Sequence, residues 1–385
     1  MRPPTADRVR AFDWLRGLAV LVMIQTHALS LLRPELRAGP FFVTLQWIDG
    51  LVAPAFILAA GFSLSLVQVR AALAKDTPGA RGRRFRKSLR RVGEVLAVAT
   101  LTNWMWFPIF REPKWILRVD ILQCIGLSLL LALPLFSWLA PRPRALRAAA
   151  LLLAALVFGI APHAEQVTGP LALFVNGSSG AVFPLLPWSG YVWLGAAVGA
   201  SAAIDGKRGA ALWLLGLAAV GLAIWFATPW FSAAYPPHQF WVTNPANAAR
   251  RWTQVAGVSL LLLAIERLTT GRPAPAAAPQ SPATATATAN AAPALLAPSS
   301  GARAIAPLRF LLETFGTSSL AGYFLHEMLL YYRIFGFSFH RTWGERCDWN
   351  QYWLVLALLL AATFALVLVV DRLYRRADAW LTGAR

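Results

Sequence analysis

An arginine and a histidine stand eleven residues apart in an otherwise apolar stretch near the amino terminus. Eleven residues of α-helix rise by about 16 Å and return to nearly the same face, so Arg16 and His27 would line one side of a helix at two depths. Ionisable groups are costly in lipid and mark functional sites there. We therefore expect this side of the helix to face a bundle interior or a watery cavity.

The composition is that of a membrane protein. The chain is 57% hydrophobic and 14% charged, with a mean hydropathy of +0.54. A soluble domain carries about 25% charged residues. The sequence predicts an all-α, polytopic transmembrane helical bundle with about ten spans. These spans are expected near residues 14–32, 47–69, 90–110, 118–138, 145–162, 184–204, 210–231, 252–268, 308–332 and 351–373.

The net charge of +19 is explained by the position of the basic residues. They concentrate in alternate loops, most densely between residues 70 and 91, as the positive-inside rule predicts for the cytoplasmic face. Both termini are then expected in the cytoplasm. The partner implied by this charge is the lipid bilayer, and no nucleic acid is needed to explain it.

One segment differs from the rest in composition. Residues 270–304 are rich in Ala, Pro and Thr, which cannot bury a core, and are predicted to form a disordered cytoplasmic linker. We expect residues 1–269 to hold the first eight spans of the membrane domain and residues 305–385 its last two. The chain has two cysteines, Cys124 and Cys347, and whether they pair stays open.

Several polar residues fall within or beside the predicted spans. His27 and His326 would lie at similar depth, which suits opposite walls of one cavity. Asp49 falls at the outer entrance of the second span, and Asp120 with Gln123 at the outer turns of the fourth. The spacing of His, Cys and acidic residues matches no metal-binding motif, so no metal site is expected.

Each of these residues also has a structural alternative. The alternatives are an interhelical hydrogen bond for His27 or His326, a helix cap for Asp49, an ion pair with Arg118 or Lys114 for Asp120, and an ion pair with Asp13 for Arg16.

The pattern of the chain resembles two related families. The Arg16 and His27 spacing resembles the first-helix motif of the acyltransferase-3 transmembrane acyltransferases. A resemblance over most of the chain is to the bacterial membrane proteins similar to heparan-α-glucosaminide N-acetyltransferase. Its motifs are Arg10-Ala11-Phe12-Asp13-Trp14-Leu15-Arg16-Gly17, the stretch from Asp49 to Ser63, Asp120-Ile121-Leu122-Gln123-Cys124-Ile125-Gly126, Phe183-Pro184-Leu185-Leu186-Pro187-Trp188, and the stretch from Gly316 to His326.

The resemblance implies an acyltransferase of the bacterial inner membrane. The family moves an acyl group, often acetyl from cytoplasmic acyl-CoA, to a hydroxyl or amine of a glycan or lipid-linked sugar on the far side. Acyl-CoA would be a cosubstrate, with no permanently bound cofactor. The lysosomal branch places its essential histidine in a loop after the first helix, and the matching loop here, residues 32–46, has no histidine. That role is therefore not carried over.

A mechanism can be assembled from these residues. His27 would remove the acceptor's proton, with Asp49 or Asp120 orienting its ring. Gln123, Asn103 or a Trp indole would donate to the developing oxyanion. His326 is a further catalytic candidate, and Trp188 could stack on the acceptor sugar. The donor would be held by basic residues nearer the cytoplasm, namely Arg16, Arg83, Arg84, Arg86 and Arg90.

Other functions and routes remain open at this stage. Buried His and Asp residues are also typical of a proton-coupled transporter, and a non-enzymatic partner in envelope assembly would share the same topology. Direct transfer and a covalent acyl-histidine intermediate fit the residues equally, and the protein could form a homo-oligomer.

Overall fold

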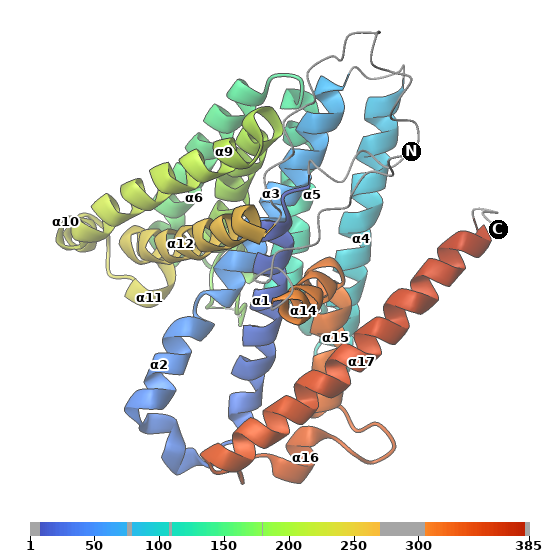
Figure 1. Ribbon diagram of the computed structural model, residues 1–385. Coiled ribbons are helices and arrows are strands. Elements are labelled where there is room, and N and C mark those ends of the chain that lie inside the picture. The colour runs from blue at the N-terminus through green and yellow to red at the C-terminus, as the bar shows by residue number, and fades with distance from the viewer. Residues whose placement is uncertain (1–7, 75–78, 108–109, 179, 270–304, 382–385) are drawn as a thin grey trace, which may run out of the picture.

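The computed structural model describes residues 8–74, 79–107, 110–178, 180–269 and 305–381, and within them the fold is helical with no β-strand (Figure 1). The prediction of an all-α fold is therefore confirmed. The predicted linker, residues 270–304, lies outside the described residues. The longer helices are α1 (Arg10–Ala28), α3 (Val52–Leu73), α4 (Ala80–Trp106), α5 (Ile121–Leu139), α6 (Pro143–Ala164), α9 (Gly190–Phe226), α12 (Pro245–Thr269), α14 (Ala306–Thr317), α15 (Ser319–Tyr331) and α17 (Trp349–Leu381).

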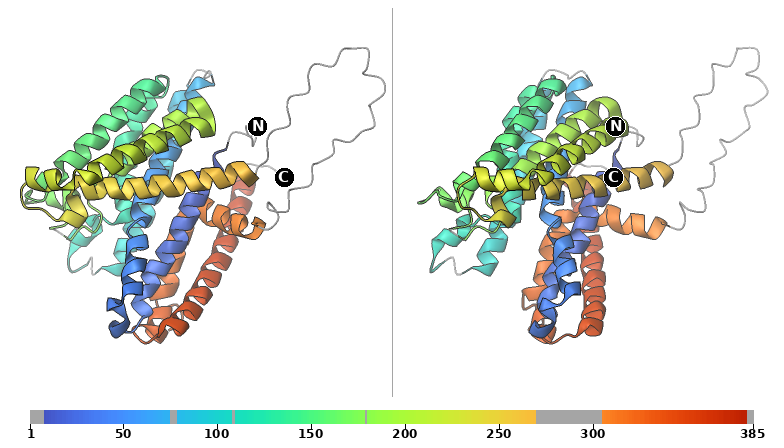
Figure 2. Two further views of the ribbon diagram at one scale, coloured as in Figure 1. Left: turned by 60° about the vertical axis from the view of Figure 1, so that its left-hand side comes forward. Right: turned by 90° about the vertical axis from the view of Figure 1, so that its left-hand side faces the viewer.

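Short helices connect them. They are α2 (Pro40–Asp49), α7 (Ala172–Val175), α8 (Leu185–Trp188), α10 (Thr228–Ala234), α11 (Phe240–Thr243) and α16 (Phe339–Trp343), with 3₁₀ segments η2 (Leu29–Leu31), η3 (Pro34–Ala38) and η4 (Pro113–Leu117). In both figures α6, α9 and α12 lie on one side of α1 and α3, and α14 to α17 lie on the other (Figures 1 and 2).

Six helical segments are long and apolar enough to cross a bilayer, which supports a membrane protein. They are Arg10–Leu31, Pro40–Leu73, Ile121–Leu139, Pro143–Ala164, Leu185–Phe226 and Trp349–Ala377. The remaining predicted spans fall on α4 and α12, which carry more charge, and on α14 with α15. The count of ten spans and the cytoplasmic termini stay predictions.

Two helix breaks determine how these segments are divided. Gly206 adopts φ 59° and ψ −144° inside α9, and a Cβ on Gly209 would lie 2.5 Å from the Ser201 carbonyl oxygen, so the chain reverses there. The predicted spans 184–204 and 210–231 thus correspond to the two arms of α9. The predicted span 308–332 is instead interrupted at Ser318, and α14 and α15 run in different directions (Figure 2).

Glycines bring α3 and α9 into backbone contact. A Cβ on Gly195 would lie 1.9 Å from the Leu58 carbonyl oxygen, and a Cβ on Gly199 would lie 2.3 Å from that of Phe62. Neither position can hold a larger residue without separating the two helices. The small-residue spacing in this segment therefore serves helix packing, as is common in membranes.

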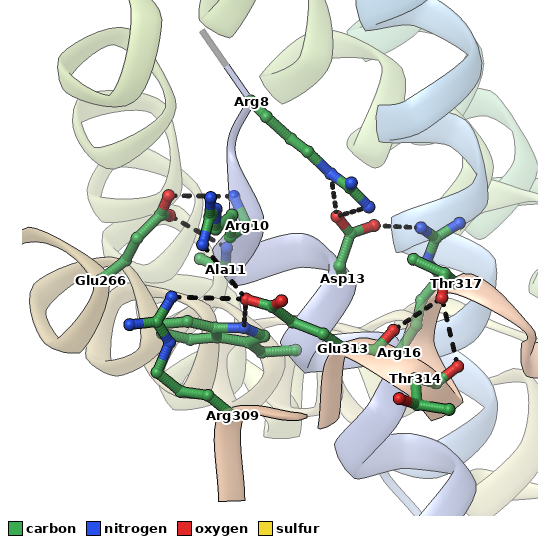
Figure 3. A network of polar contacts seen from close by, with 11 residues as sticks. Arg8, Arg10, Ala11, Asp13, Arg16, Glu266, Arg309, Glu313, Thr314 and Thr317 are labelled. Carbon is green, nitrogen blue, oxygen red and sulfur yellow. Dashed lines mark hydrogen bonds and ion pairs between the residues drawn. The ribbon is translucent and has the colours of Figure 1, made fainter. Parts of the chain in front are cut away.

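The first turn of α1 is fixed by carboxylates from two other helices, of which Glu266 is buried and Glu313 partly exposed (Figure 3). The Glu266 carboxylate on α12 accepts hydrogen bonds from the backbone N–H groups of Arg10 and Ala11, both at 3.0 Å, and lies 2.8 Å from the Lys207 ammonium group. Glu313 on α14 accepts a 3.1 Å hydrogen bond from the Trp14 indole. The helix that carries Arg16 and His27 is thus held in a defined position.

Candidate functional site

A cavity of about 910 Å³ lies between α1, α3, α4, α5 and α15. Arg16 and His27 both line it, in agreement with the expectation that one face of this helix meets a cavity. The other predicted site residues in its wall are Asp49, Asp120 and Trp188. A smaller neighbouring cavity of about 430 Å³ shares Thr26 and Asp49 with it and extends past the end of α1.

His27, Glu327 and His326 form a buried polar group where α1 meets α15. The Nδ1 atom of His27 contacts Oε1 of Glu327, and Nε2 of His326 lies 3.4 Å from the same oxygen. The two imidazole rings are 5.1 Å apart between centroids, so the histidines do face each other. His326 is fully buried, whereas the His27 side chain is 33% exposed and lines the cavity.

Hydrogen bonds to the backbone orient this group. Nδ1 of His326 lies 3.0 Å from the Gly322 carbonyl oxygen, which can only accept, so Nδ1 carries the proton. The Tyr331 hydroxyl donates to the carbonyl oxygen of His27 at 3.2 Å and ties α15 to the end of α1. The His27 ring is therefore approached by α15 from one side and by the cavity from another.

Glu327 is the functional candidate that sequence reasoning missed. Glu327 is adjacent to His326 and lies at the same predicted depth in the membrane. The sequence does not indicate how the helix is rotated, and the rotation decides which of the two side chains contacts His27. The residues expected to orient His27 were Asp49 and Asp120. They are close enough to interact electrostatically with His27, yet the carboxylate in contact with its ring belongs to Glu327.

Asp49 and Asp120 have different surroundings. Asp120 precedes α5, and its Oδ1 accepts a 2.6 Å hydrogen bond from the N–H of Ile121, as part of a capping box with Gln123. Asp49 is the last residue of α2, and both its carboxylate oxygens are buried without a hydrogen-bond partner among the described residues. The hydroxyl of Thr26, which lines the same cavity, is the polar neighbour of this carboxylate.

The two predicted amide donors are occupied elsewhere. The side-chain amide of Gln123 donates to the Ala99 carbonyl oxygen at 2.8 Å, and Gln123 does not line the cavity. Asn103 does line it, but its amide donates to backbone carbonyls near η4, including that of Arg118 at 2.8 Å. Both amides therefore hold the fold of this region.

The basic residues separate into those in the cavity and those outside it. Arg16 pairs with Asp13, as one reading of the sequence suggested, while its Nε is buried without a partner in the described part of the chain (Figure 3). Arg91 also lines the cavity. The predicted donor-binding residues of α4 are not part of the lining, namely Arg83, Arg84, Arg86 and Arg90.

Trp188 lines the cavity together with Arg251 of α12, which was not expected from the sequence. The Arg251 guanidinium carbon lies 5.3 Å from the centroid of the Trp188 ring. Arg251 directly follows Arg250 near the start of a predicted span, where arginines are a common topology signal, so the sequence alone does not single it out.

The structure bears on two further questions, metal binding and the pairing of the two cysteines. The potential ligand atoms of His27, His326 and Glu327 lie within 4.8 Å of one another, a spacing that could hold a metal ion. The direct contact between His27 and Glu327 engages two of these atoms with each other. Cys124 and Cys347 are both buried, free thiols.

Comparison with protein families decides the classification. Residues 8–227, more than half of the sequence, match the family described as heparan-alpha-glucosaminide N-acetyltransferase, catalytic. The chain belongs to this family. A search among curated proteins found no match. The family match spans α1 to α9 and thus the elements that contribute Arg16, His27, Asp49 and Asp120 to the cavity, and it supports a membrane acetyltransferase.

Proposed function

We propose that this protein is an inner-membrane acyltransferase that moves an acyl group from cytoplasmic acyl-CoA to a hydroxyl or amine of a periplasm-facing glycan or lipid-linked sugar. The acyl group is most simply acetyl, in keeping with the family. The observation that carries the proposal is the shared cavity. Arg16 and His27 line one continuous space at two levels of the same helix, so a donor held at one level can react at the other.

The donor enters at the end of the cavity where Arg16 and Arg91 lie. Their guanidinium groups suit phosphate or carbonyl oxygens of the CoA moiety. Between this end and His27 the wall is mostly apolar, with Leu64, Val92 and Val95 among its residues, which suits the pantetheine arm. The first turns of α4, with Arg83, Arg84, Arg86 and Arg90, would attract the nucleotide phosphates from outside the cavity.

His27 acts as the general base. It accepts the proton of the acceptor hydroxyl or amine as that group attacks the thioester carbonyl carbon. The carbon–sulfur bond then breaks, the acyl group remains on the acceptor, and the proton passes from His27 to the departing CoA sulfur. Glu327 is a positioning residue, because its carboxylate holds the His27 ring and stabilises the imidazolium ion.

The acceptor approaches from the side of the smaller cavity, past Thr26 and Asp49. In this proposal Asp49 accepts a hydrogen bond from a sugar hydroxyl, and the Asp120 carboxylate lies in the same cavity wall. Trp188 offers a ring surface for a sugar. His326 supports the reaction through Glu327, because it is buried and does not line the cavity.

The test uses purified full-length protein, radiolabelled acetyl-CoA and fractionated envelope glycans. We expect labelled glycan with the wild type and a loss of about 1,000-fold in rate with His27→Ala, in the range typical of a missing general base. His163→Ala is the matched control, because His163 lies at the end of α6 outside the cavity wall. Substrate uptake into proteoliposomes without CoA binding would instead identify a transporter.

A further inference from the structure

Arg251 is a charge that the protein leaves uncompensated at the cavity wall. It forms no ion pair with any carboxylate in the part of the chain that the structure describes, and its Nε atom is buried without a hydrogen-bond partner there. Its polar neighbour is the hydroxyl group of Tyr191. A guanidinium removed from water needs an anion or several acceptors to offset its desolvation.

Trp188 presents a second unused donor at the same place. The side chain is 7% exposed, and its indole Nε1 is buried with no partner among the described residues. The ring lies beneath the Arg251 guanidinium at 5.3 Å, so the two groups form one unit of the wall. Buried indole N–H groups normally find an acceptor. Nε of Arg251 and Nε1 of Trp188 are therefore two donors of cavity-lining residues with no acceptor among the described residues, while the Tyr191 hydroxyl is the one polar partner beside the guanidinium.

Other arginines near aromatic rings show what a structural role looks like here. Arg250 bonds Asn247 at 3.1 Å and stacks 4.2 Å above the Trp47 ring, and Arg118 donates to the Gly180 carbonyl oxygen at 3.0 Å and lies over Phe107. Neither of these two arginines lines the cavity. Nη1 of Arg250 is also buried without a partner among the described residues, so the difference is one of place: Arg251 lines the cavity, and its polar neighbour is the Tyr191 hydroxyl.

We propose that Arg251 and Trp188 form a subsite for an anionic oxygen group, a carboxylate or a phosphate, on the sugar that accepts the acyl group. This rests on the proposed function only in calling that sugar the acceptor. A carboxylate or phosphate supplies both the charge for the guanidinium and the lone pairs for two N–H donors. A neutral hydroxyl could satisfy the hydrogen bonds but would leave the charge uncompensated.

The charges elsewhere in the cavity would fix the orientation of such a sugar. Asp49, Asp120 and Glu327 all line the cavity, and they repel an anion from the region of His27. The anionic group therefore settles at Arg251, and the uncharged hydroxyl or amine of the same molecule is directed toward the base. The subsite thus selects which end of the acceptor reacts.

Equilibrium dialysis of the full-length protein in detergent, without acyl-CoA, tests the subsite. The probes are radiolabelled glucuronic acid, glucose 6-phosphate and neutral glucose. We expect at least one anionic sugar to bind the wild type about tenfold more tightly than glucose, as one charge-assisted contact provides. The sugar that binds more tightly identifies the carboxylate or the phosphate as the preferred group.

The variants separate this subsite from general charge attraction. Arg251→Gln is expected to bind all three sugars equally, Arg251→Lys to keep part of the preference, and Trp188→Phe to weaken anion binding about threefold. Arg333→Gln is the matched control, because Arg333 is an exposed residue in the loop after α15, and it should behave as the wild type. If Arg251→Gln does not fold, the Lys and Phe variants still report on the site.

Two results would overturn the proposal. One is equal binding of the three sugars by the wild type, and the other is a preference for the anionic sugars that survives in Arg251→Gln. Dialysis against labelled acetyl-CoA is run in parallel. Failure of that binding counts against the acyltransferase function and leaves the sugar result unaffected, so the two conclusions stand or fall separately.

Discussion

The start of α1 and the wall of the cavity use polar residues in opposite ways. At the start of α1, Glu266 and Glu313 contact backbone amides, an indole and basic side chains that belong to the protein (Figure 3). In the cavity wall, polar atoms of Arg16, Asp49 and Trp188 are buried with no partner in the described residues. Both regions carry charge in an apolar setting. At the start of α1 the two carboxylates are bonded by the chain, although Nε of Arg309 lacks a partner among the described residues, whereas in the cavity wall the carboxylate oxygens of Asp49 have no hydrogen-bond partner there.

Buried polar atoms are nearly always hydrogen-bonded in native proteins. The role of a buried polar group that the chain itself bonds is thus best explained by a contribution to stability. The role of a group that is left without a partner beside a cavity is best explained by ligand binding. The difference predicts that substitutions at the start of α1 change stability and that substitutions at the cavity change turnover or binding. Four measurements follow, in order of expected effect.

Glu266→Gln should have the largest effect and should act on stability. The Glu266 side chain is 1% exposed, and the substitution removes the charge that Lys207 faces, so we expect a loss of about 3 kcal/mol in the free energy of unfolding. Thermal denaturation in detergent measures this loss. The folded fraction should keep the wild-type kcat. A variant that is as stable as the wild type but inactive would contradict the assignment of Glu266 to stability.

Glu327→Gln should reduce kcat by about 100-fold with little change in the KM for acyl-CoA. The amide keeps the shape of the side chain but cannot stabilise the imidazolium form of His27. Steady-state kinetics with labelled donor separate the two parameters. Glu35→Gln, at an exposed residue of η3, is the control. A rise in KM at constant kcat would assign Glu327 to donor binding instead.

Arg16→Gln should raise the KM for acyl-CoA about tenfold and leave kcat within about threefold, because it removes a charged contact to the donor. Direct binding of labelled CoA gives an independent measurement. Arg8→Gln is the matched control: Arg8 also pairs with Asp13, but its side chain is 57% exposed and does not line the cavity. Equal effects of the two variants would show that only their shared ion pair matters.

Arg86→Gln should have the smallest effect, about a twofold rise in the same KM, because an exposed charge acts through solvent. The difference from the wild type should disappear at high ionic strength. A salt-independent change of tenfold or more would place Arg86 in a specific phosphate contact and would extend the ligand-binding region beyond the cavity.

The features that the sequence predicted correctly depend on local periodicity and composition. The helical class and the apolar segments follow from hydropathy, and the meeting of Arg16 and His27 in one cavity follows from their spacing along a single helix. The proximity of His27 and His326 was predicted from depth alone. The role of Gln123 could have been identified as well, because Asp120 three residues earlier forms a capping-box pattern.

The other features depend largely on how helices distant in the sequence pack against one another. The partner of His27 is decided by the rotation of α15 against α1, and one sequence gives no measure of that rotation. The interruption at Ser318 did leave a signal, since Gly316-Thr317-Ser318-Ser319 is a run of poor helix formers, but the apolar residues on both sides favour one continuous span. Arg251 enters the site through the packing of α12, which the sequence pattern does not reveal.

The close approach of α3 to α9 limits the motion of these two helices relative to each other. Gly195 and Gly199 clamp one flank of α3, while Phe56 and Leu64 on that helix border the interior space. Because this pair cannot part without losing its backbone contact, α3 and α9 form one rigid unit of the cavity wall. A cross-link that joins α3 to α9 should therefore leave turnover unchanged.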